Sequence, residues 1–545
     1  MSYIKLNNVL GWCCFAAALL VYFLTLERSV SNWDSGEFIA AAYKLQVVHQ
    51  PGAPLYLMLA KIFSLFAGSN REHVAFWMNI SSATVSAASI MFLFWTITAL
   101  AYKVISPRGT DLTTSNLITI LGSGLTGAFA FTFSDSFWFS AVESEVYALS
   151  SLCTAVVFWA LLKWDRRADE PGSDRWLVFL AYLMGLSIGV HLLNLLTIPA
   201  IALFYYLRRS PQINFKGILL STLAGAGILI FIQYGIIQYT VKYAAYADLL
   251  FVNTIGLPFG SGIVVFSFLV IVCLTAGIAY TINAKKSQLY LAVLSFLLFM
   301  MLGGGLMGFI CAGLVIAALE YGFRIREKRY VLNLALISTV FILFGFGSFA
   351  MIVIRADANP TLNNYHASDA FSLSGYVNRE QYVKPPLFYG PYFDSKPVDV
   401  TTGEMIYRKG KDRYEAVGPE VKRVYDRNTL LPRLHSDDPN HAARYKAWLG
   451  LSESESPTFL DNLKFMFSHQ ISFMYLRYFA WNFIGRQNDV QGDGDHISGN
   501  WLSGIKPLDN VVLGGQYALP SGQLANKAFN KLSDIVLAHQ QSGSV

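Results

Sequence analysis

The sequence has few charged residues and few cysteines for its length. Only 14% of its 545 residues are Asp, Glu, Lys or Arg, whereas 54% are hydrophobic. Together with a mean hydropathy of +0.42, this composition excludes an ordinary soluble protein. The five cysteines all lie in apolar runs and residues 355–545 contain none, so a disulfide framework is not expected.

Several common functional motifs are also missing. The sequence contains no phosphate-binding glycine loop, dinucleotide fingerprint, nucleophile elbow, CxxC pair or internal repeat. The net charge of +6 is modest, and most Lys and Arg of the first half lie in short connectors. We therefore predict no nucleic-acid partner. No resident metal or cofactor is expected, although carboxylates could bind a divalent cation.

The charged residues are distributed unevenly along the chain. Residues 1–354 contain 36 of them, whereas the shorter stretch 355–545 contains 40. The first region is thus apolar enough for a bilayer and the second polar enough for water. This contrast predicts a transmembrane module over 1–354, followed by a water-exposed domain over 355–545.

Long uncharged runs in the first region predict about eleven membrane-spanning helices, because backbone in lipid must satisfy its own hydrogen bonds. Two runs are too long for one crossing, and we divide them at His191 and Asn194 and at Gly303–Gly305. The first run continues without a cleavage site, so we expect it to remain as a helix. The expected spans are 8–26, 76–101, 117–133, 147–162, 176–190, 195–207, 218–240, 261–282, 288–301, 306–320 and 330–354.

The basic residues indicate the orientation of these spans. Sixteen of the twenty-one Lys and Arg before residue 355 fall on one side if the spans alternate. Short cytoplasmic loops collect Lys and Arg. The N-terminus is therefore expected inside, and the loops 27–75 and 134–146, together with the C-terminal domain, outside.

Loop 27–75 contains the first candidate site residues, in the segment WDSGEFIAAAYKLQVVHQPGAP. Asp34 and Glu37 have the spacing of a capping box at the start of a helix. Beside Trp33, a partly buried carboxylate could equally act as a general base. His49 lies in the same loop but lacks the paired spacing of a metal-binding histidine.

Loop 134–146 supplies three more acidic candidates. Asp135 follows Ser134 and could cap the next short helix. Glu143 and Glu145 are two residues apart, so on a helix they would point to different sides. We therefore expect at most one of them to face a site and the other to be solvated.

Polar residues at helix ends complete the candidates. His191 and Asn194 interrupt an apolar run, where His191 could either stabilise helix packing or take part in chemistry. Arg355 follows the last span. It could anchor that helix at the membrane surface or bind a lipid phosphate through two parallel hydrogen bonds.

The region 355–545 is rich in Tyr, Pro, Asp and Lys and has turn signals without a strong helical period. It predicts a loop-rich, mixed α/β domain. Within it, the aromatic segment 459–485 also contains Lys464, His469 and Arg477. This combination favours an amphipathic helix at the membrane interface.

Several segments together resemble one family of polytopic membrane proteins. They are WDSGEFIAAAYKLQVVHQPGAPLY, AVESEVYALSSL, GVHLLNLL, RADANP, GYVNREQY and YFAWNFIGRQND. The family was long known as a domain of unknown function, and it includes a eukaryotic O-mannosyltransferase of plexin-type immunoglobulin-like domains. This chain resembles a short bacterial member.

The resemblance implies an all-α, GT-C-like bundle with a polyprenyl-phosphate-linked sugar as donor and Ser or Thr hydroxyls of proteins as acceptor. It maps the catalytic base to Asp34, with Glu37 adjacent, and further polar groups to Glu143 and Glu145. Arg355, His191 and Asn194 are then our candidates for binding the donor. The expected location is a bacterial inner membrane, with the site facing away from the cytosol. A secondary transporter with broken helices and a non-catalytic scaffold are the alternatives.

Overall fold

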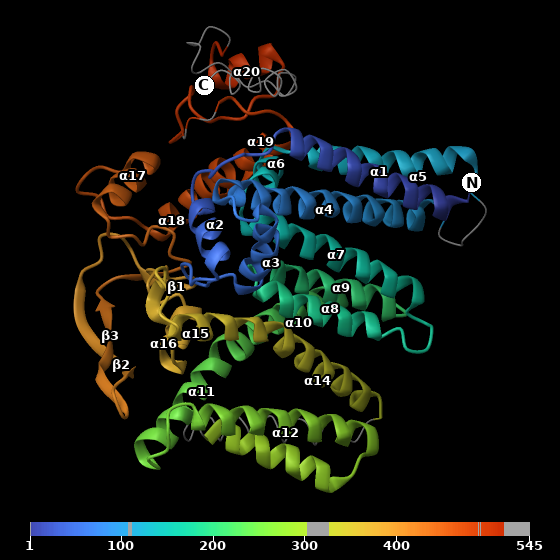
Figure 1. Ribbon diagram of the computed structural model, residues 1–545. Helices are drawn as coiled ribbons and strands as arrows, with labels where there is room; N and C mark the ends of the chain where they lie inside the picture. The colour runs from blue at the N-terminus through green and yellow to red at the C-terminus, as the bar shows by residue number, and fades with distance from the viewer. Residues whose placement is uncertain (1, 107–111, 302–325, 489, 491, 517–545) are drawn as a thin grey trace. The chain divides into compact units, whose positions relative to one another are not determined.

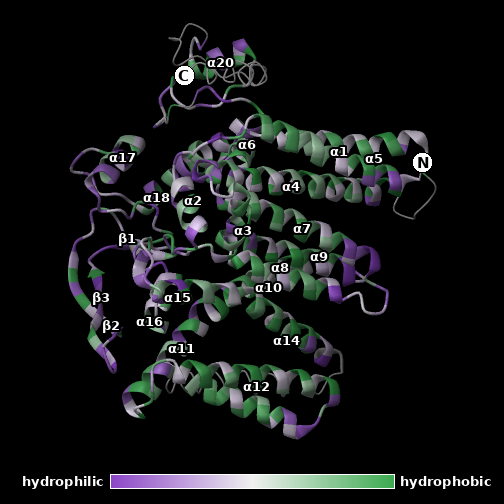
Figure 2. Ribbon diagram, in the orientation of Figure 1, coloured by the Kyte–Doolittle hydropathy of each residue, from purple (hydrophilic) through white to green (hydrophobic). Residues whose placement is uncertain are grey.

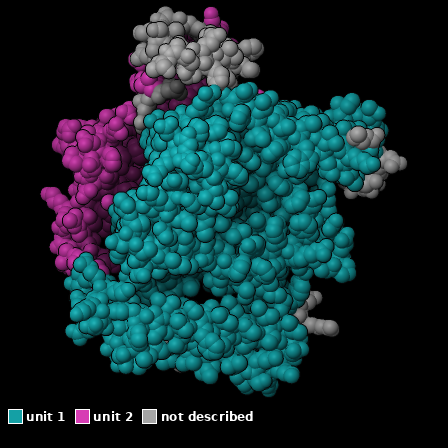
Figure 3. All heavy atoms as spheres, viewed as in Figure 1, with its two compact units in different colours: residues 1–132, 140–381, 407–417 teal, residues 133–139, 382–406, 418–545 magenta. Residues whose placement is uncertain are grey.

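The computed structural model describes residues 2–106, 112–301, 326–488, 490 and 492–516 (Figure 1). The chain divides into two compact units, coloured teal and magenta in Figure 3. Unit 1 comprises residues 1–132, 140–381 and 407–417, and unit 2 comprises 133–139, 382–406 and 418–545. Residues 355–381, which the sequence assigns to the outer domain, are therefore grouped with the helical unit.

Unit 1 is built from helices. They are α1 (Tyr3–Leu24), α2 (Ser35–Lys44), α3 (Pro54–Ser64), α4 (Val74–Ile105), α5 (Thr114–Thr132), α7 (Val146–Arg167), α8 (Arg175–Ile188), α9 (Ile198–Arg209), α10 (Phe215–Ile230), α11 (Thr240–Leu249), α12 (Ser261–Asn283), α14 (Arg326–Phe346), α15 (Ala350–Asp357) and α16 (Ala370–Val377). π-helical turns over Phe231–Tyr239 and Leu250–Thr254 extend α10 and α11. Helix α6 (Asp135–Val142) begins in unit 2 and ends in unit 1.

Six helical segments of the described residues are long and apolar enough to cross a membrane: Tyr3–Leu24, Arg71–Ile105, Val146–Arg167, Phe215–Thr254, Ser261–Asn283 and Arg329–Asp357. A seventh results if Thr114–Thr132 and Asp135–Val142, bent by 66°, form one span. Shorter apolar helices cover Pro54–Ala67, Arg175–Ile188 and Lys286–Met301. The protein is thus a helical membrane protein, and the count of eleven crossings stays a prediction.

Helices occur at every expected span within the described residues. The predicted break near His191 is present, because α8 ends at Ile188 and a 3₁₀ turn over Leu192–Thr197 leads into α9. The expected span 306–320 and the break at Gly303–Gly305 lie outside the described residues, as does Cys311.

Small residues let several helices approach closely. A Cβ atom on Gly185 of α8 would lie 2.5 Å from the carbonyl oxygen of Ile342 in α14, and one on Gly345 would lie 2.4 Å from the backbone of Gly185. A Cβ atom on Gly225 of α10 would lie 2.5 Å from Cα of Pro199 in α9. Such contacts are typical of membrane helices, where close packing replaces the hydrophobic effect between helices.

Among the described residues, unit 1 contains two large clusters of buried hydrophobic side chains. One gathers buried residues of α7, α8 and α14, and the other gathers those of α2, α3 and the start of α4. Many apolar side chains of the long helices remain exposed, among them Val264, Phe268 and Ile271 of α12 at 61–69%. Figure 2 shows hydrophobic residues along most of these helices. Such surfaces are expected for helices whose outer faces contact lipid.

Unit 2 is a mixture of short strands, helices and loops, as predicted. Its strands are β1 (Tyr389–Pro391) and β4 (Asn428–Leu430), which pair antiparallel, and β2 (Pro397–Lys409) and β3 (Tyr414–Tyr425), which form a second two-stranded sheet. Residues 407–417, at the tip of that sheet, are grouped with unit 1. The helices are α17 (Pro439–Leu449), α18 (Phe459–Phe465), α19 (Arg477–Phe483) and α20 (Lys506–Leu513).

The aromatic segment 459–485 is helical, as expected. Helix α18 continues through a π-helical turn, Met466–Leu476, into α19. Arg477 is only 9% exposed. Its guanidinium lies over the rings of Phe473 and Trp481 and donates to the carbonyl of Gly499. The guanidinium of Arg477 therefore finds its partners within unit 2. The location of this helix at a membrane surface stays a prediction.

Candidate active site

The candidate site forms around the N-terminal end of α2. Asp34 immediately precedes α2, and Glu37 lies in its first turn. The predicted capping box is wrong, because Asp34 has helical backbone angles and its side chain makes no capping hydrogen bond. Trp33, at φ 58°, is 86% exposed. Asp34 and Glu37 are thus not engaged in capping the helix.

Both oxygens of Glu37 instead contact His49, twelve residues further along the chain. The backbone N–H of His49 donates to Oε1 at 2.8 Å, and Nδ1 lies 2.5 Å from Oε2. The other ring nitrogen, Nε2, lies 3.9 Å from Oδ2 of Asp34. The imidazole therefore bridges the two carboxylates that the sequence places one helical turn apart.

The backbone of the loop that carries His49 is fixed by hydrogen bonds from α16. The buried Tyr376 of α16 donates its hydroxyl to the carbonyl of Val48 at 2.5 Å and to that of His49 at 3.3 Å. Gly52 follows at φ 98°, and a Cβ atom there would lie 2.5 Å from the hydroxyl oxygen of Tyr376. Glycine is required at this position because both the backbone angle and the space exclude a side chain.

The ion pair changes the acidity of both partners. Burial alone would raise the pKa of Glu37, but the hydrogen bonds from the side chain and backbone of His49 lower it overall. The hydrogen bond with Glu37 raises the pKa of His49, burial opposes this, and the charges of Glu37, Asp34 and Glu145 add to the rise. The pair thus favours imidazolium beside carboxylate.

Glu143 and Glu145 lie in the turn between α6 and α7. Both are buried, at 4% and 6% exposure, so the expectation that one is solvated is wrong. The helical-spacing argument fails because these residues are not helical. Ser144 fixes the turn by donating its hydroxyl to Oδ1 of Asn79 in α4 at 2.6 Å.

The buried glutamates hold their protons unusually tightly. Burial raises the pKa of Glu145 to about 7, the charges of Glu143 and Asp34 add to this, and His49 opposes it. Burial also raises the pKa of Glu143. One carboxylate oxygen of Glu143, Oε2, has no hydrogen-bond partner among the described residues. Glu145 therefore lies close enough to Asp34 and His49 to interact with their charges.

His191 and Asn194 lie at the break between α8 and α9. His191 caps the 3₁₀ turn, its Nδ1 accepting from the N–H of Leu193 at 3.1 Å, and its ring packs against Tyr147 of α7. Burial lowers the pKa of His191, and the charge of Arg379 adds to this. Asn194 is 1% exposed and accepts from the hydroxyl of Thr154 at 3.0 Å. Asn194 thus joins the break to α7 inside the protein.

Arg355 is engaged at the other end of α2. Its Nε donates to the carbonyl of Leu45 at 2.5 Å and its Nη2 to that of Lys44 at 3.3 Å. A ten-residue helix is about 15 Å long, so Arg355 and Asp34 are not brought together. A guanidinium at a helix C-terminus stabilises the unpaired carbonyls there. Its predicted contact with a donor phosphate remains to be tested.

Asp135 belongs to unit 2 and has a structural partner there. It is the first residue of α6, and its carboxylate pairs with Arg486 at 2.9 Å. The backbone N–H of Ser136 is bound by the side chain of Asn482 at 2.8 Å. These contacts tie the start of α6 to the end of α19 and to the segment that follows it.

Asp34, Glu37 and His49 could together hold a metal ion. Each offers one ligand atom, and the three atoms lie within 4.8 Å of one another. Two carboxylates and an imidazole suit a divalent cation such as Mn²⁺ or Zn²⁺. The sequence indicates this grouping only weakly, because His49 is not paired with another histidine at helical spacing.

Two supporting residues were not anticipated from the sequence. Tyr376 fixes the loop of His49, and Arg379 influences His191. Both lie in GYVNREQY, a segment that carries the family resemblance. The family resemblance of this segment was the available signal for a role of Tyr376 and Arg379. Residue type alone gave none, because tyrosine and arginine are common in polar stretches.

Comparison with known proteins matches the part of the chain that contains this site. Residues 34–214 match the family described as the N-terminal domain of protein O-mannosyl-transferase TMEM260. Residues 383–467 match a family of unknown function, DUF8416. No solved structure matches the chain.

Two curated relatives have similar sequences. The protein O-mannosyl-transferase tmem260 of Dictyostelium discoideum is 27% identical over 195 residues, 35% of this chain and 22% of the relative. The protein O-mannosyl-transferase TMEM260 of Mus musculus is 27% identical over 231 residues, 41% of this chain and 30% of the relative. Each alignment therefore spans less than a third of the relative.

Proposed function

We propose that this chain is a membrane-embedded protein O-mannosyltransferase, because residues 34–214 match the family of protein O-mannosyl-transferase TMEM260 N-terminal domains. The donor is mannose or a similar sugar linked to a polyprenyl phosphate, and the acceptors are Ser and Thr hydroxyls of proteins. The membrane module is of the GT-C type with about eleven crossings. Its site faces away from the cytosol.

The observation that carries this proposal is the grouping of Asp34, Glu37 and His49 at the start of α2. It lies within the matched residues, and the match begins at Asp34. The Asp34 side chain is 61% exposed, whereas Glu37 is 24% exposed and committed to His49. Asp34 is therefore the carboxylate that an acceptor hydroxyl can reach, and Glu37 positions the imidazole.

The transfer needs a base, a nucleophile and a leaving group. Asp34 takes the proton of the acceptor hydroxyl while that oxygen bonds to the anomeric carbon of the sugar. The bond between this carbon and the phosphate oxygen breaks, and its electron pair leaves with the polyprenyl phosphate. The proton on Asp34 then passes to water, because the side chain is exposed. His49 orients Asp34 by attracting its carboxylate from 3.9 Å.

Binding of the donor phosphate requires cations or hydrogen-bond donors near Asp34. His49 is a group of this kind, since its Nε2 lies 3.9 Å from Oδ2 of Asp34. Support for the other donor-binding candidates is weaker, because Arg355 is bound to carbonyls of α2 and Asn194 to Thr154. His191 packs its ring against Tyr147, and Arg379 acts on it electrostatically.

The decisive experiment replaces the proposed base. Asp34→Asn keeps the size and polarity of the side chain but removes its basicity. We expect transfer from polyprenyl-phosphate-linked mannose to a Ser/Thr acceptor peptide to fall by about 100-fold or more. Transfer is measured with purified full chain by mass spectrometry of the glycopeptide.

Asp357→Asn serves as the matched control, because Asp357 is an exposed aspartate at the end of α15. We expect this variant to retain transfer. If a folded Asp34→Asn protein transfers mannose at the wild-type rate, Asp34 is not the base. Absence of transfer by the wild type with every lipid-linked sugar tried would contradict the proposed reaction itself.

A further inference from the structure

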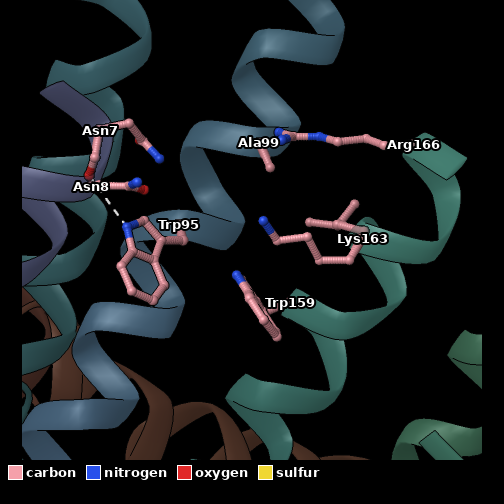
Figure 4. Close-up of a pocket in the computed structure, with 8 residues that line it drawn as sticks. Asn7, Asn8, Trp95, Ala99, Trp159, Lys163 and Arg166 are labelled. Atoms are coloured by element: carbon pink, nitrogen blue, oxygen red, sulfur yellow. Dashed lines mark hydrogen bonds between the residues drawn. The ribbon is translucent and has the colours of Figure 1, made fainter. Parts of the chain in front are cut away.

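A cavity lies between α1, α4 and α7, far from the Asp34 group. Helix α7 begins directly after Glu145, and the cavity is at the other end of this helix, in its last two turns (Figure 4). Twenty-two residues of helix span about 33 Å, close to the thickness of a bilayer core. The cavity and the Asp34 group therefore lie near opposite membrane surfaces.

The polar groups that face this cavity are mainly hydrogen-bond donors. Lys163 and Arg166 of α7 extend toward its centre, and the indole nitrogen of Trp159 is on the same side (Figure 4). The remaining lining residues are Asn7, Asn8, Trp95, Ala99 and Leu162. No carboxylate is among the lining residues.

The nearby acidic residue is already neutralised. Asp165, which is 7% exposed, pairs with Lys103 at 2.8 Å and with Arg208 at 3.3 Å. Within the described part of the chain, neither Lys163 nor Arg166 forms a salt bridge with a carboxylate. The cavity thus presents two cations that no carboxylate of the described residues pairs with.

Aromatic rings shape the floor of the cavity. The ammonium of Lys163 lies over the ring of Trp159, 5.1 Å from its centroid. Trp95 is fixed across from it, because its Nε1 donates to the carbonyl of Asn7 at 3.3 Å. Trp side chains together with Lys and Arg are typical of helix ends at a membrane surface.

The size of the cavity limits the ligand. Its volume is about 100 Å³, which corresponds to roughly three water molecules at about 30 Å³ each. It adjoins a larger cavity of about 400 Å³ that shares Ala99, Leu162 and Arg166 with it and is also lined by the paired Lys103 and Asp165. The smaller cavity suits a phosphate group, and the larger gives room for the rest of a headgroup.

Basic residues at the cytoplasmic end of a helix are common, because they follow the positive-inside rule and stabilise the helix C-terminus. Arg167 fits this explanation, since it does not line the cavity. Arg166 is exposed, as Arg167 is, but it lines the cavity. Lys163 and Arg166 differ from Arg167, because both line this one pocket together with the indole of Trp159. Basic pockets between membrane helices are known to bind anionic lipid headgroups.

We propose that this cavity binds a phosphate group, presented by an anionic lipid of the leaflet at that end of α7. Lys163 supplies a point charge and Arg166 a planar pair of N–H donors for the phosphate oxygens. The site is separate from the proposed transfer reaction and does not depend on it.

The test measures lipid retention by the full-length protein in nanodiscs of phosphatidylcholine with added phosphatidylglycerol. Bound phosphatidylglycerol is counted by native mass spectrometry for wild type, Lys163→Gln, Arg166→Gln and the matched control Arg167→Gln. We expect wild type and Arg167→Gln to retain phosphatidylglycerol, and the two cavity variants to bind it about tenfold more weakly, because each loses a charge-assisted hydrogen bond. Thermal unfolding of each variant verifies that it is folded.

A second arm distinguishes lipid from free phosphate. Inorganic phosphate is titrated into the protein in neutral detergent and binding is followed by calorimetry. Phosphate binding that the cavity variants lose, without retention of phosphatidylglycerol, would support a site for free phosphate instead. Equal phosphatidylglycerol retention by all four proteins would overturn the proposal, since neither cavity residue would then contribute to binding. An equal loss in Arg167→Gln would also overturn it, since only general surface charge would then matter.

Discussion

Asp34 and Glu37 show how two carboxylates of one helix start acquire different roles from their surroundings. Glu37 binds both the backbone and the side chain of His49. Asp34 makes no such hydrogen bonds with His49, and its side chain is 61% exposed. Residue type alone could not separate the two, because the difference comes from a histidine twelve positions away.

At the residue scale, Glu145 predicts a pH dependence of stability. Its pKa is raised from 4.5 to about 7 in the folded protein, so the folded state binds the proton more tightly than the unfolded state. Stability should therefore fall as pH rises from about 4.5 to about 7, by on the order of 3 kcal/mol for this group. Glu145→Gln should remove that loss, so that the variant unfolds at a higher temperature than wild type at pH 8 but not at pH 4.5.

Thermal unfolding followed by intrinsic fluorescence in detergent measures this difference. Glu72→Gln is the control, because Glu72 is an exposed glutamate of unit 1. We expect it to follow the wild-type pH profile. An unchanged profile in Glu145→Gln would show that the carboxyl group at position 145 is solvated.

At the element scale, α2 is held at both ends by residues distant in sequence. Glu37 in its first turn binds the loop of His49, and Arg355 binds the carbonyls of Lys44 and Leu45 after its last turn. The helix that presents Asp34 is therefore fixed in position by contacts with other parts of unit 1.

Replacing Arg355 tests whether it acts through α2. Arg355→Ala removes both donors from the end of the helix, so we expect stability to fall by about 1–2 kcal/mol and the maximal rate of transfer to fall with it. The KM for the lipid-linked donor should stay unchanged. Unfolding temperature and transfer kinetics are the two measurements.

Arg28→Ala is a suitable control, because Arg28 is an exposed arginine of loop 27–75, the loop that also contains α2. It should leave stability and kinetics as in wild type. A raised donor KM without loss of stability in Arg355→Ala would contradict the structural role and indicate a phosphate contact.

Sequence reasoning located elements better than it described the contacts between them. Apolar runs predicted helices correctly because lipid requires continuous backbone hydrogen bonding. The spacing of Asp34 and Glu37 predicted a capping box wrongly, since a tertiary contact with His49 competes with the local one. The same limit applies to Glu143 and Glu145, whose burial depends on α4 and on the turn between α6 and α7.

At the scale of the whole molecule, the division into units could not be predicted from charge alone. Residues 133–139 lie in the first half of the sequence but group with unit 2, through pairs such as Asp135 with Arg486. Such a pair joins positions 351 residues apart, and no local pattern indicates it. The contrast between an apolar first region and a polar second region is nevertheless visible in composition.

The orientation of unit 1 in the membrane is directly testable. Glu72 lies in the predicted outer loop 27–75, and Asp169, which is 75% exposed, lies in the predicted inner loop after α7. We expect a membrane-impermeant maleimide to label Glu72→Cys in intact cells and Asp169→Cys only after permeabilisation. The parent chain without an added cysteine is the control. Labelling of both from one side would contradict the alternating arrangement of the intervening helices.

The double contact between Glu37 and His49 has a practical consequence. One of the two bonds uses the peptide N–H and would persist with any residue other than proline at position 49. Replacing His49 should therefore alter the acidity of Glu37 and the charge of the site, while the backbone of the loop keeps its conformation. Substitutions at position 49 can thus change the chemistry of the site without changing the fold of the loop.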